Sequence, residues 1–327
     1  MNKRGFEFSF AWIFAIVIGV FVLFLAIYAA MKVIDVGQQG TQTKTAKEIS
    51  IIFNPLETGL ASGKSSLLRL NAETRIYNKC SLEGSFGRQS FSTSQKLGFS
   101  KDWPKPGDSI ILHNKYVFSD ETEDGKEFYF FSKPFNMPFK VSELIFMSSK
   151  KYCFVNAPGF IEDEIKQLEL KNVKIENCSS QDVKVCFSRT GNCNVSVYGD
   201  CSGICSPDYG EYEFGHTIKN GKEVYYISSL LYGTIFSEPE VYNCNFKRLM
   251  SRIIQISNLY KEEAGFLASR GCGDVIALDL IKLSQAASNA RNSTSPLTIL
   301  NLREAEEALD SQNLAQGNCG IYEWVGK

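Results

Sequence analysis

The chain has 327 residues, of which 44% are hydrophobic and 22% are charged. Its 35 basic and 36 acidic residues nearly cancel, which excludes a protein dedicated to binding nucleic acid, because such proteins carry a basic excess. The hydrophobic content excludes a largely disordered chain, and the length predicts about two domains of ordinary size.

An uncharged, apolar segment covers residues 8–31 and follows a short leader at residues 1–7. As a helix, its 24 residues span ~36 Å, enough to cross a hydrocarbon core of ~30 Å. Trp12 and Tyr28 stand near its two ends, where aromatic rings favour the membrane interface. A buried core helix would carry a polar stripe, and a cleaved secretory signal would have a shorter apolar run. We therefore predict one transmembrane helix in a lipid bilayer, with the leader in the cytoplasm.

The leader itself contains Lys3-Arg4-Gly5, which is followed directly by Phe6 and the apolar segment. This arrangement resembles the start of type IV pilin-like proteins. The resemblance implies that a dedicated peptidase cuts between Gly5 and Phe6 and that the helix packs into a filament core. The chain departs from the family at Glu7, which would be the second mature residue, whereas the family commonly has a glutamate at the fifth. The resemblance covers about 30 of the 327 residues, and an uncleaved signal anchor is the alternative interpretation.

Small residues repeat every four positions in the apolar segment, at Ala11, Ala15 and Gly19. This spacing places them on one face of a helix, and such faces let membrane helices approach closely. The stripe therefore predicts self-association through the membrane helix.

A polar, glycine-containing stretch at residues 32–50 is expected to form a stalk, and a β-rich ectodomain is expected over residues 51–240. One helix is expected inside this domain, near residues 159–170. Three pairs of strand-like segments are expected to form hairpins: 110–118 with 126–132, 183–188 with 193–199, and 216–219 with 222–228 across Asn220-Gly221.

The chain contains ten cysteines but no repeated Cys-x-x-Cys pair, a pattern typical of disulfides rather than of zinc sites. Because disulfides persist in oxidising compartments, we expect the large C-terminal region to be extracytoplasmic. Three glycosylation sequons, at Asn177, Asn194 and Asn292, agree with this orientation. The chain is thus interpreted as a single-pass protein of the cell membrane.

The last part of the chain, residues 241–327, has the three- and four-residue apolar spacing of helices. We predict three helices: one ending near Ser269, a second over residues 274–289, and a third opened by a capping box at Asn301 and Glu304. If these helices run up, down and up, Cys272 and Cys319 lie at the same end. We therefore predict a disulfide between Cys272 and Cys319.

Several motifs that resemble sites of chemistry do not fit their templates. Residues 59–65 have three residues where a phosphate loop needs four. The acidic segment 120–125 departs from a calcium loop at Thr122, and we interpret it as a solvated hairpin tip. His113 and His216 are the only histidines, and no Ser or Cys lies in a nucleophile motif. We therefore predict no catalytic, cofactor-binding or metal site.

These observations predict an α+β protein with an N-terminal transmembrane helix, a β-rich disulfide-containing ectodomain and a C-terminal three-helix element. Its expected role is structural or adhesive at the cell surface, and the resemblance implies a pilin-like subunit. Two alternatives stay open: a membrane-tethered extracytoplasmic enzyme and an accessory subunit of a membrane complex.

Overall fold

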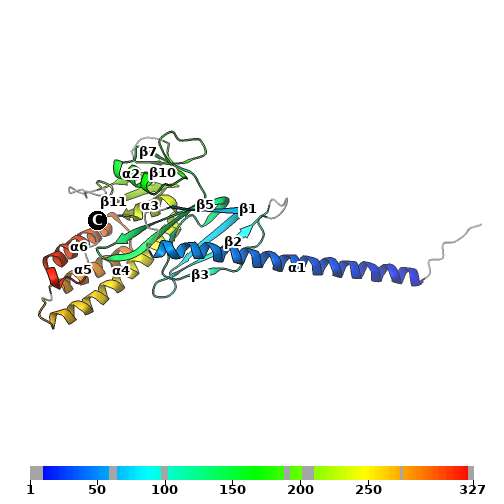
Figure 1. The fold of residues 1–327 in the computed structure, drawn as a ribbon, viewed down its shortest axis with the longest axis horizontal. Helices are drawn as coiled ribbons and strands as arrows, with labels where there is room; N and C mark the ends of the chain where they lie inside the picture. Colours follow the sequence, from blue (N-terminus) through cyan, green and yellow to red (C-terminus); the bar gives the residue numbers. More distant parts are fainter. Residues whose placement is uncertain are drawn as a thin grey trace, which may run out of the picture.

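The chain folds into a head and one long projecting helix. The computed structural model describes residues 10–58, 65–96, 102–187, 192–200, 210–272 and 275–322. Helix α1 (Phe10–Glu57) leaves the head on one side (Figure 1). Within the described residues the head contains two six-stranded sheets, several helices and four disulfides. The fold therefore mixes helices and strands, with one apolar helix at the N-terminus.

The first sheet is antiparallel except at one edge. Its strand order is β3-β2-β1-β5-β6-β4, and β4 runs parallel to β6. The strands are β1 (Ser65–Ser81), β2 (Arg88–Gln95), β3 (Ile110–Leu112), β4 (Tyr116–Phe118), β5 (Thr122–Asn136) and β6 (Lys140–Ser148).

The hairpin expected between residues 110–118 and 126–132 is wrong, and so is the solvated tip expected between them. The two short strands of the first segment lie at opposite edges of the sheet, and β5 starts at Thr122 and pairs with β1. The acidic residues are held within the sheet: Asp124 accepts hydrogen bonds from Arg75 on β1, at 2.6 Å from Nε and 2.5 Å from Nη2. Two-point pairing with an arginine extends the strand into the segment that composition assigns to a loop.

The second sheet has the order β12-β11-β10-β9-β7-β8. Its β7, β8, β9 and β10 are parallel to their neighbours within that group, and helix α2 (Gly159–Gln167) connects β7 to β8. The strands are β7 (Tyr152–Val155), β8 (Val173–Ile175), β9 (Val183–Cys186), β10 (Val195–Gly199), β11 (Phe214–Lys219) and β12 (Lys222–Ile227).

Of the two hairpins expected in this sheet, one is confirmed. Strands β11 and β12 are antiparallel, and the turn residues Asn220 and Gly221 have φ of 52° and 73°, the left-handed values that this tight turn requires. The other hairpin is wrong, since β9 and β10 are parallel, with Val195 opposite Val185. A disulfide joins Cys186 to Cys193 and holds the end of β9 close to the segment before β10.

The C-terminal part of α1 is built into the head. Ile49, Phe53 and Leu56 are fully buried, at spacings of four and three residues that place them on one side of the helix. The Phe53 ring lies 5.4 Å from that of Phe91 and 5.8 Å from that of Phe130, centre to centre, on one face of the first sheet. Residues 32–50, expected to form a stalk, are part of this same helix, and packing in the turns that follow stabilises it.

The opposite face of the first sheet belongs to a larger core, which also includes the second sheet, helix α2 and four helices that follow the second sheet in the chain. These helices are α3 (Leu230–Phe236), α4 (Pro239–Ala268), α5 (Ile276–Asn292) and α6 (Pro296–Ala315). Helices α4, α5 and α6 lie on the side of the head away from the free end of α1 (Figure 1). The C-terminal three-helix element is thus roughly as expected, but it shares its core with the sheets.

Helix α6, the third helix of the C-terminal element, starts earlier than expected. The capping box is formed by Ser295 and Thr298, each side chain bonding the other's backbone N–H, with Pro296 as the first helical residue. The expected box at Asn301 and Glu304 lies inside the helix, because the Ser-Pro start satisfies the free backbone groups six residues earlier.

The structure also joins the two cysteines that the helix order brings together. Cys272, after α4, is bonded to Cys319, after α6. Cys244, at the start of α4, is bonded to Cys80 on β1 and so connects the helices to the first sheet. Cys201 and Cys205 lie outside the described residues.

Candidate functional site

The most exposed apolar surface described is the free part of α1. Residues Phe10–Val33 have a mean hydropathy of 3.0, and none of them is buried against the head. This is the one helix among the described residues that is long and apolar enough to cross a membrane, as a membrane or signal anchor would be. Ala11, Ala15 and Gly19 lie on this free helix, whereas Gly5 and Phe6 lie outside the described residues.

A short polar stretch of helix separates the apolar part from the head. Among the α1 side chains that the structure describes, the first buried one is Gln42, nine residues after Val33, which corresponds to ~13 Å of helix. Here polar contacts fix the helix: Thr93 on β2 donates to the Gln42 carbonyl at 2.8 Å, and the Asp108 N–H donates to the Thr43 hydroxyl at 3.0 Å. The exposed helix is therefore held rigidly at the point where it reaches the head.

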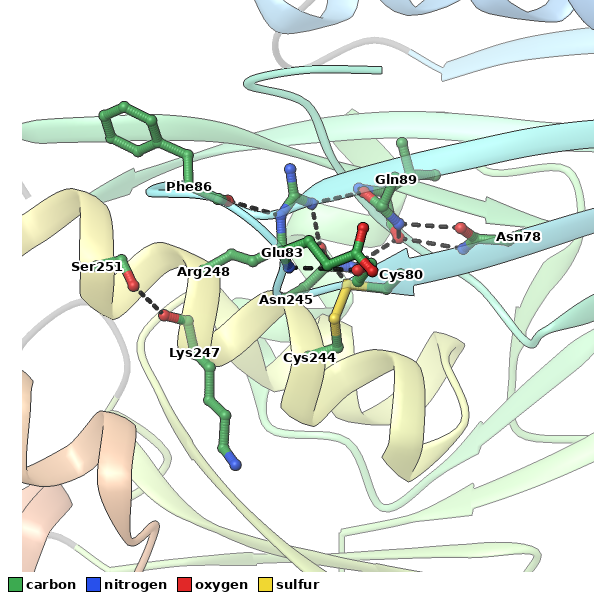
Figure 2. Close-up of a disulfide and its surroundings, with 12 residues drawn as sticks. Asn78, Cys80, Glu83, Phe86, Gln89, Cys244, Asn245, Lys247, Arg248 and Ser251 are labelled. Carbon is green, nitrogen blue, oxygen red and sulfur yellow. Dashed lines mark hydrogen bonds between the residues drawn. A yellow bond between two sulfur atoms is a disulfide. The ribbon is translucent and has the colours of Figure 1, made fainter. Parts of the chain in front are cut away.

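Helix α4 is held on the first sheet by a buried arginine. Arg248 is 1% exposed, and its burial lowers the pKa of its guanidinium to about 10. Figure 2 shows that it points from α4 into a group of polar side chains. Its Nε donates to the Phe86 carbonyl at 3.0 Å, and its Nη1 donates to Gln89 Oε1, the Lys115 carbonyl and Asn245 Oδ1 at 3.1, 3.0 and 2.8 Å.

The same network continues into the sheet. Gln89 Nε2 donates to Asn78 Oδ1 at 3.0 Å and to the Val117 carbonyl at 2.7 Å, and the Val117 N–H donates to Gln89 Oε1 at 2.8 Å (Figure 2 shows Asn78 and Gln89). The Cys80–Cys244 disulfide lies beside it. Because these buried groups hydrogen-bond to one another, the network positions α4 on the sheet, and within the described residues only Nη2 of Arg248 in this group has no hydrogen-bond partner.

A second buried polar cluster connects the two sheets. Asp120 pairs with Lys150 and with Lys219, whose Nζ lies 3.3 Å from Oδ1. Glu123 accepts hydrogen bonds from the backbone N–H and the hydroxyl of Ser149, at 2.9 and 2.5 Å. Burial, with the charge of Asp120, raises the pKa of Glu123 to about 7. Perturbed carboxyls are common at active sites, but this one is 0% exposed, so the cluster serves the structure.

Lys219 also secures the end of α3. Its Nζ donates to the Ile235 and Ser237 carbonyls at 3.2 and 2.9 Å. These carbonyls belong to the last turn of the helix, where backbone acceptors lack partners within the helix. Burial lowers the pKa of Lys219, although the Asp120 charge opposes this effect. A single lysine thus joins β11, the end of α3 and the first sheet.

The two histidines lie in separate surface depressions. His113 lines an open groove of about 520 Å³ with Glu83 and Arg88. His216, on β11, lines a cavity of about 440 Å³ and has its Nε2 3.6 Å from Glu223 Oε1. Within the described ranges, no Ser, Thr or Cys side chain hydrogen-bonds to either histidine, and no group of three His, Cys, Asp or Glu residues gathers as metal ligands do.

The exposed helix, the two buried polar networks and the His216 cavity are the features from which a function can be argued. No known protein family, curated protein or solved structure matches the chain. Any function for this chain must therefore come from the chemistry of its own side chains.

The sequence predictions include neither the two buried polar networks, nor the packed side of α1, nor the His216 cavity. The packed side of α1 carries a readable signal, since Ile49, Phe53 and Leu56 recur at helical spacing directly after the stretch expected as a stalk. The His216 cavity has no such signal, because its walls come from β11, β12 and α6, which are distant in the sequence.

Proposed function

We propose that the protein is a single-pass, membrane-anchored surface protein with a structural role, and that it assembles through α1 as a pilin-like subunit. In this proposal the leader is cytoplasmic and the disulfide-bonded head is extracytoplasmic. The observation that supports this proposal is the continuity of α1, which is a single helix from the exposed apolar part at Phe10–Val33 to the turns that pack in the head.

The continuity of α1 favours assembly over simple anchoring. A plain anchor needs only an apolar segment, and a flexible linker to its domain serves equally well. Here Phe53 is fully buried in the head and Thr93 bonds the backbone of the same helix at Gln42, so the head and the apolar helix form one body. If many such helices pack together, their heads take a defined spacing and orientation, which is what a structural subunit requires.

The composition of the free helix supports contact between copies. Side chains such as Phe14 and Phe24 are 59% and 67% exposed and have no partner surface within the described chain. Contact between such an apolar surface and water is unfavourable, so either lipid or other helices must cover the surface. The small residues Ala15 and Gly19 then allow close helix–helix approach on one side.

The first experiment determines the N-terminus of the mature protein. We expect mass spectrometry of protein purified from native membranes to find Phe6 as the first residue. Replacement of Gly5 by Leu should leave the leader attached, because the resemblance places the cut directly after this glycine. An intact Met1 or Asn2 terminus would remove the pilin-like reading and leave an uncleaved signal anchor.

The second experiment tests assembly directly. A Gly19→Leu variant adds bulk to the small-residue face, whereas a Val17→Leu variant adds one methylene on the opposite side of the helix. After chemical cross-linking in membranes, Gly19→Leu should lose the ladder of oligomers, and Val17→Leu should keep it. The same monomer pattern for wild type and both variants would refute assembly, and protease resistance of the head on intact cells would refute its orientation.

A further inference from the structure

The cavity beside His216 has an aromatic wall built by the second sheet. It opens between the β11–β12 hairpin and the start of α6. His216 stacks on Tyr198 with ring centres 4.8 Å apart, and Tyr225 lies 5.8 Å away on the other side. The three residues are cross-strand neighbours on β10, β11 and β12, so the strand register fixes this row of rings on one face of the sheet.

The facing wall is aliphatic and comes from the first turns of α6. Pro296, Leu297, Ile299 and Leu300 line the cavity, and Leu297 is 64% exposed. The capping box before these residues fixes the start of the helix and therefore this wall. A volume of about 440 Å³ between an aromatic and an aliphatic wall is in the range of pockets that bind small ligands.

Among the described residues that line the cavity, Asp200 and Glu223 have charged side chains, and both are acidic. Glu223 Oε1 accepts a hydrogen bond from the Tyr225 hydroxyl at 2.8 Å, while no described group donates to its Oε2. Arg303 lies behind the wall, over the Phe214 ring, and its guanidinium pairs with Glu213 and Glu307. The cavity therefore favours a positive charge at the end where Glu223 and Tyr225 meet.

We propose that this cavity binds an alkylammonium group, with the cation beside Glu223 and the Tyr225 ring and the aliphatic chain along Leu297 and Leu300. A carboxylate supplies an ionic hydrogen bond, and an aromatic face attracts a cation. The leucines offer an apolar surface to the alkyl chain and thereby select an alkylammonium over a small inorganic cation. This binding role is separate from the assembly role of α1.

The test uses full-length protein in nonionic detergent, with isotope-labelled Ile and Leu methyl groups observed by NMR. Titration with n-pentylammonium should shift the methyl signals of Ile299 and Leu300, and 1-pentanol should bind about tenfold more weakly because it lacks the charge. Glu223→Gln should weaken n-pentylammonium binding about fivefold, the size expected of a half-exposed ionic contact. Glu262→Gln removes an exposed carboxylate on α4 and should leave the affinity unchanged.

A further titration distinguishes two sources of the same chemistry. Nα-acetyl-lysine methylamide presents the ammonium as a protein side chain does, and n-pentylammonium presents it as a free amine. Tighter binding of Nα-acetyl-lysine methylamide would identify a lysine side chain of a protein as the source, and tighter binding of n-pentylammonium would identify a free amine. Equal affinities for n-pentylammonium and 1-pentanol, or an unchanged affinity in Glu223→Gln, would overturn the proposal. Neither result would bear on assembly through α1, which is measured in the membrane.

Discussion

The buried carboxyl of Glu123 should make the stability of the head depend on pH. Its pKa is about 7 in the folded protein, against an ordinary value of 4.5. The folded state therefore binds this proton more tightly than the unfolded state does. Its contribution to stability is complete below about pH 4.5 and is lost as the pH rises to 7, because the unfolded chain ionises first. The difference amounts to about 3 kcal/mol.

Replacement of Glu123 by Gln removes this dependence. At pH 8 the variant should be more stable than the wild type by up to about 3 kcal/mol, and near pH 4.5 the two should be equal. The neighbouring Glu121 is exposed, so Glu121→Gln should change the free energy of unfolding by less than about 0.5 kcal/mol at either pH. Urea unfolding in detergent, followed by tryptophan fluorescence from pH 4.5 to pH 8, measures all three proteins.

The decisive quantity is the slope of the unfolding free energy against pH. Wild type and Glu121→Gln should share one slope, and Glu123→Gln should be flatter. If Glu123→Gln keeps the wild-type slope, the carboxyl is already ionised in the folded state, and Ser149 then outweighs burial and the charge of Asp120. That result would refute the reasoning.

Three further substitutions test other parts of the fold by the same denaturation assay. Phe53→Ala should cost about 3–5 kcal/mol because it opens the core beneath α1, whereas Ile51→Ala, 63% exposed on the same helix, should cost far less; equal losses would contradict the packing. Joint replacement of Cys272 and Cys319 by Ser should cost about 4 kcal/mol in the chain-entropy model for a separation of 47 residues, and no loss would show the bridge to be unnecessary. Lys219→Met should cost about 3–5 kcal/mol, since it leaves buried acceptors unpaired; unchanged stability would show that Lys150 suffices.

Features that depend on neighbouring residues could be predicted from the sequence. The apolar segment follows from its lack of charge, and the turn at Asn220-Gly221 follows from residues that tolerate left-handed backbone. The pairing of Cys272 with Cys319 follows from three helices in series joined by short connections.

Features that depend on distant partners could not be predicted. The acidic segment 120–125 looks like a loop because its composition is polar, but Arg75 and Ser149 hold it in and beside a strand. The parallel pairing of β9 with β10 is likewise hidden, because a short connection between strand-like segments normally indicates a hairpin. The walls of the His216 cavity come from β11, β12 and α6, which are distant in the sequence, so no local sequence pattern predicts the cavity.

The turns of α1 between Val33 and Gln42 connect the apolar part of the helix rigidly to the head, so a tilt of the helix also moves the head. In the proposed membrane arrangement, the centre of the bilayer lies near Val22, and the helix runs a further ~50 Å from there to Leu56. Membrane helices tilt by ~20° on average, and over this arm such a tilt moves the head sideways by ~17 Å. Because no hinge among the described residues absorbs the motion, a change in bilayer thickness that alters the tilt would be transmitted to the far side of the head.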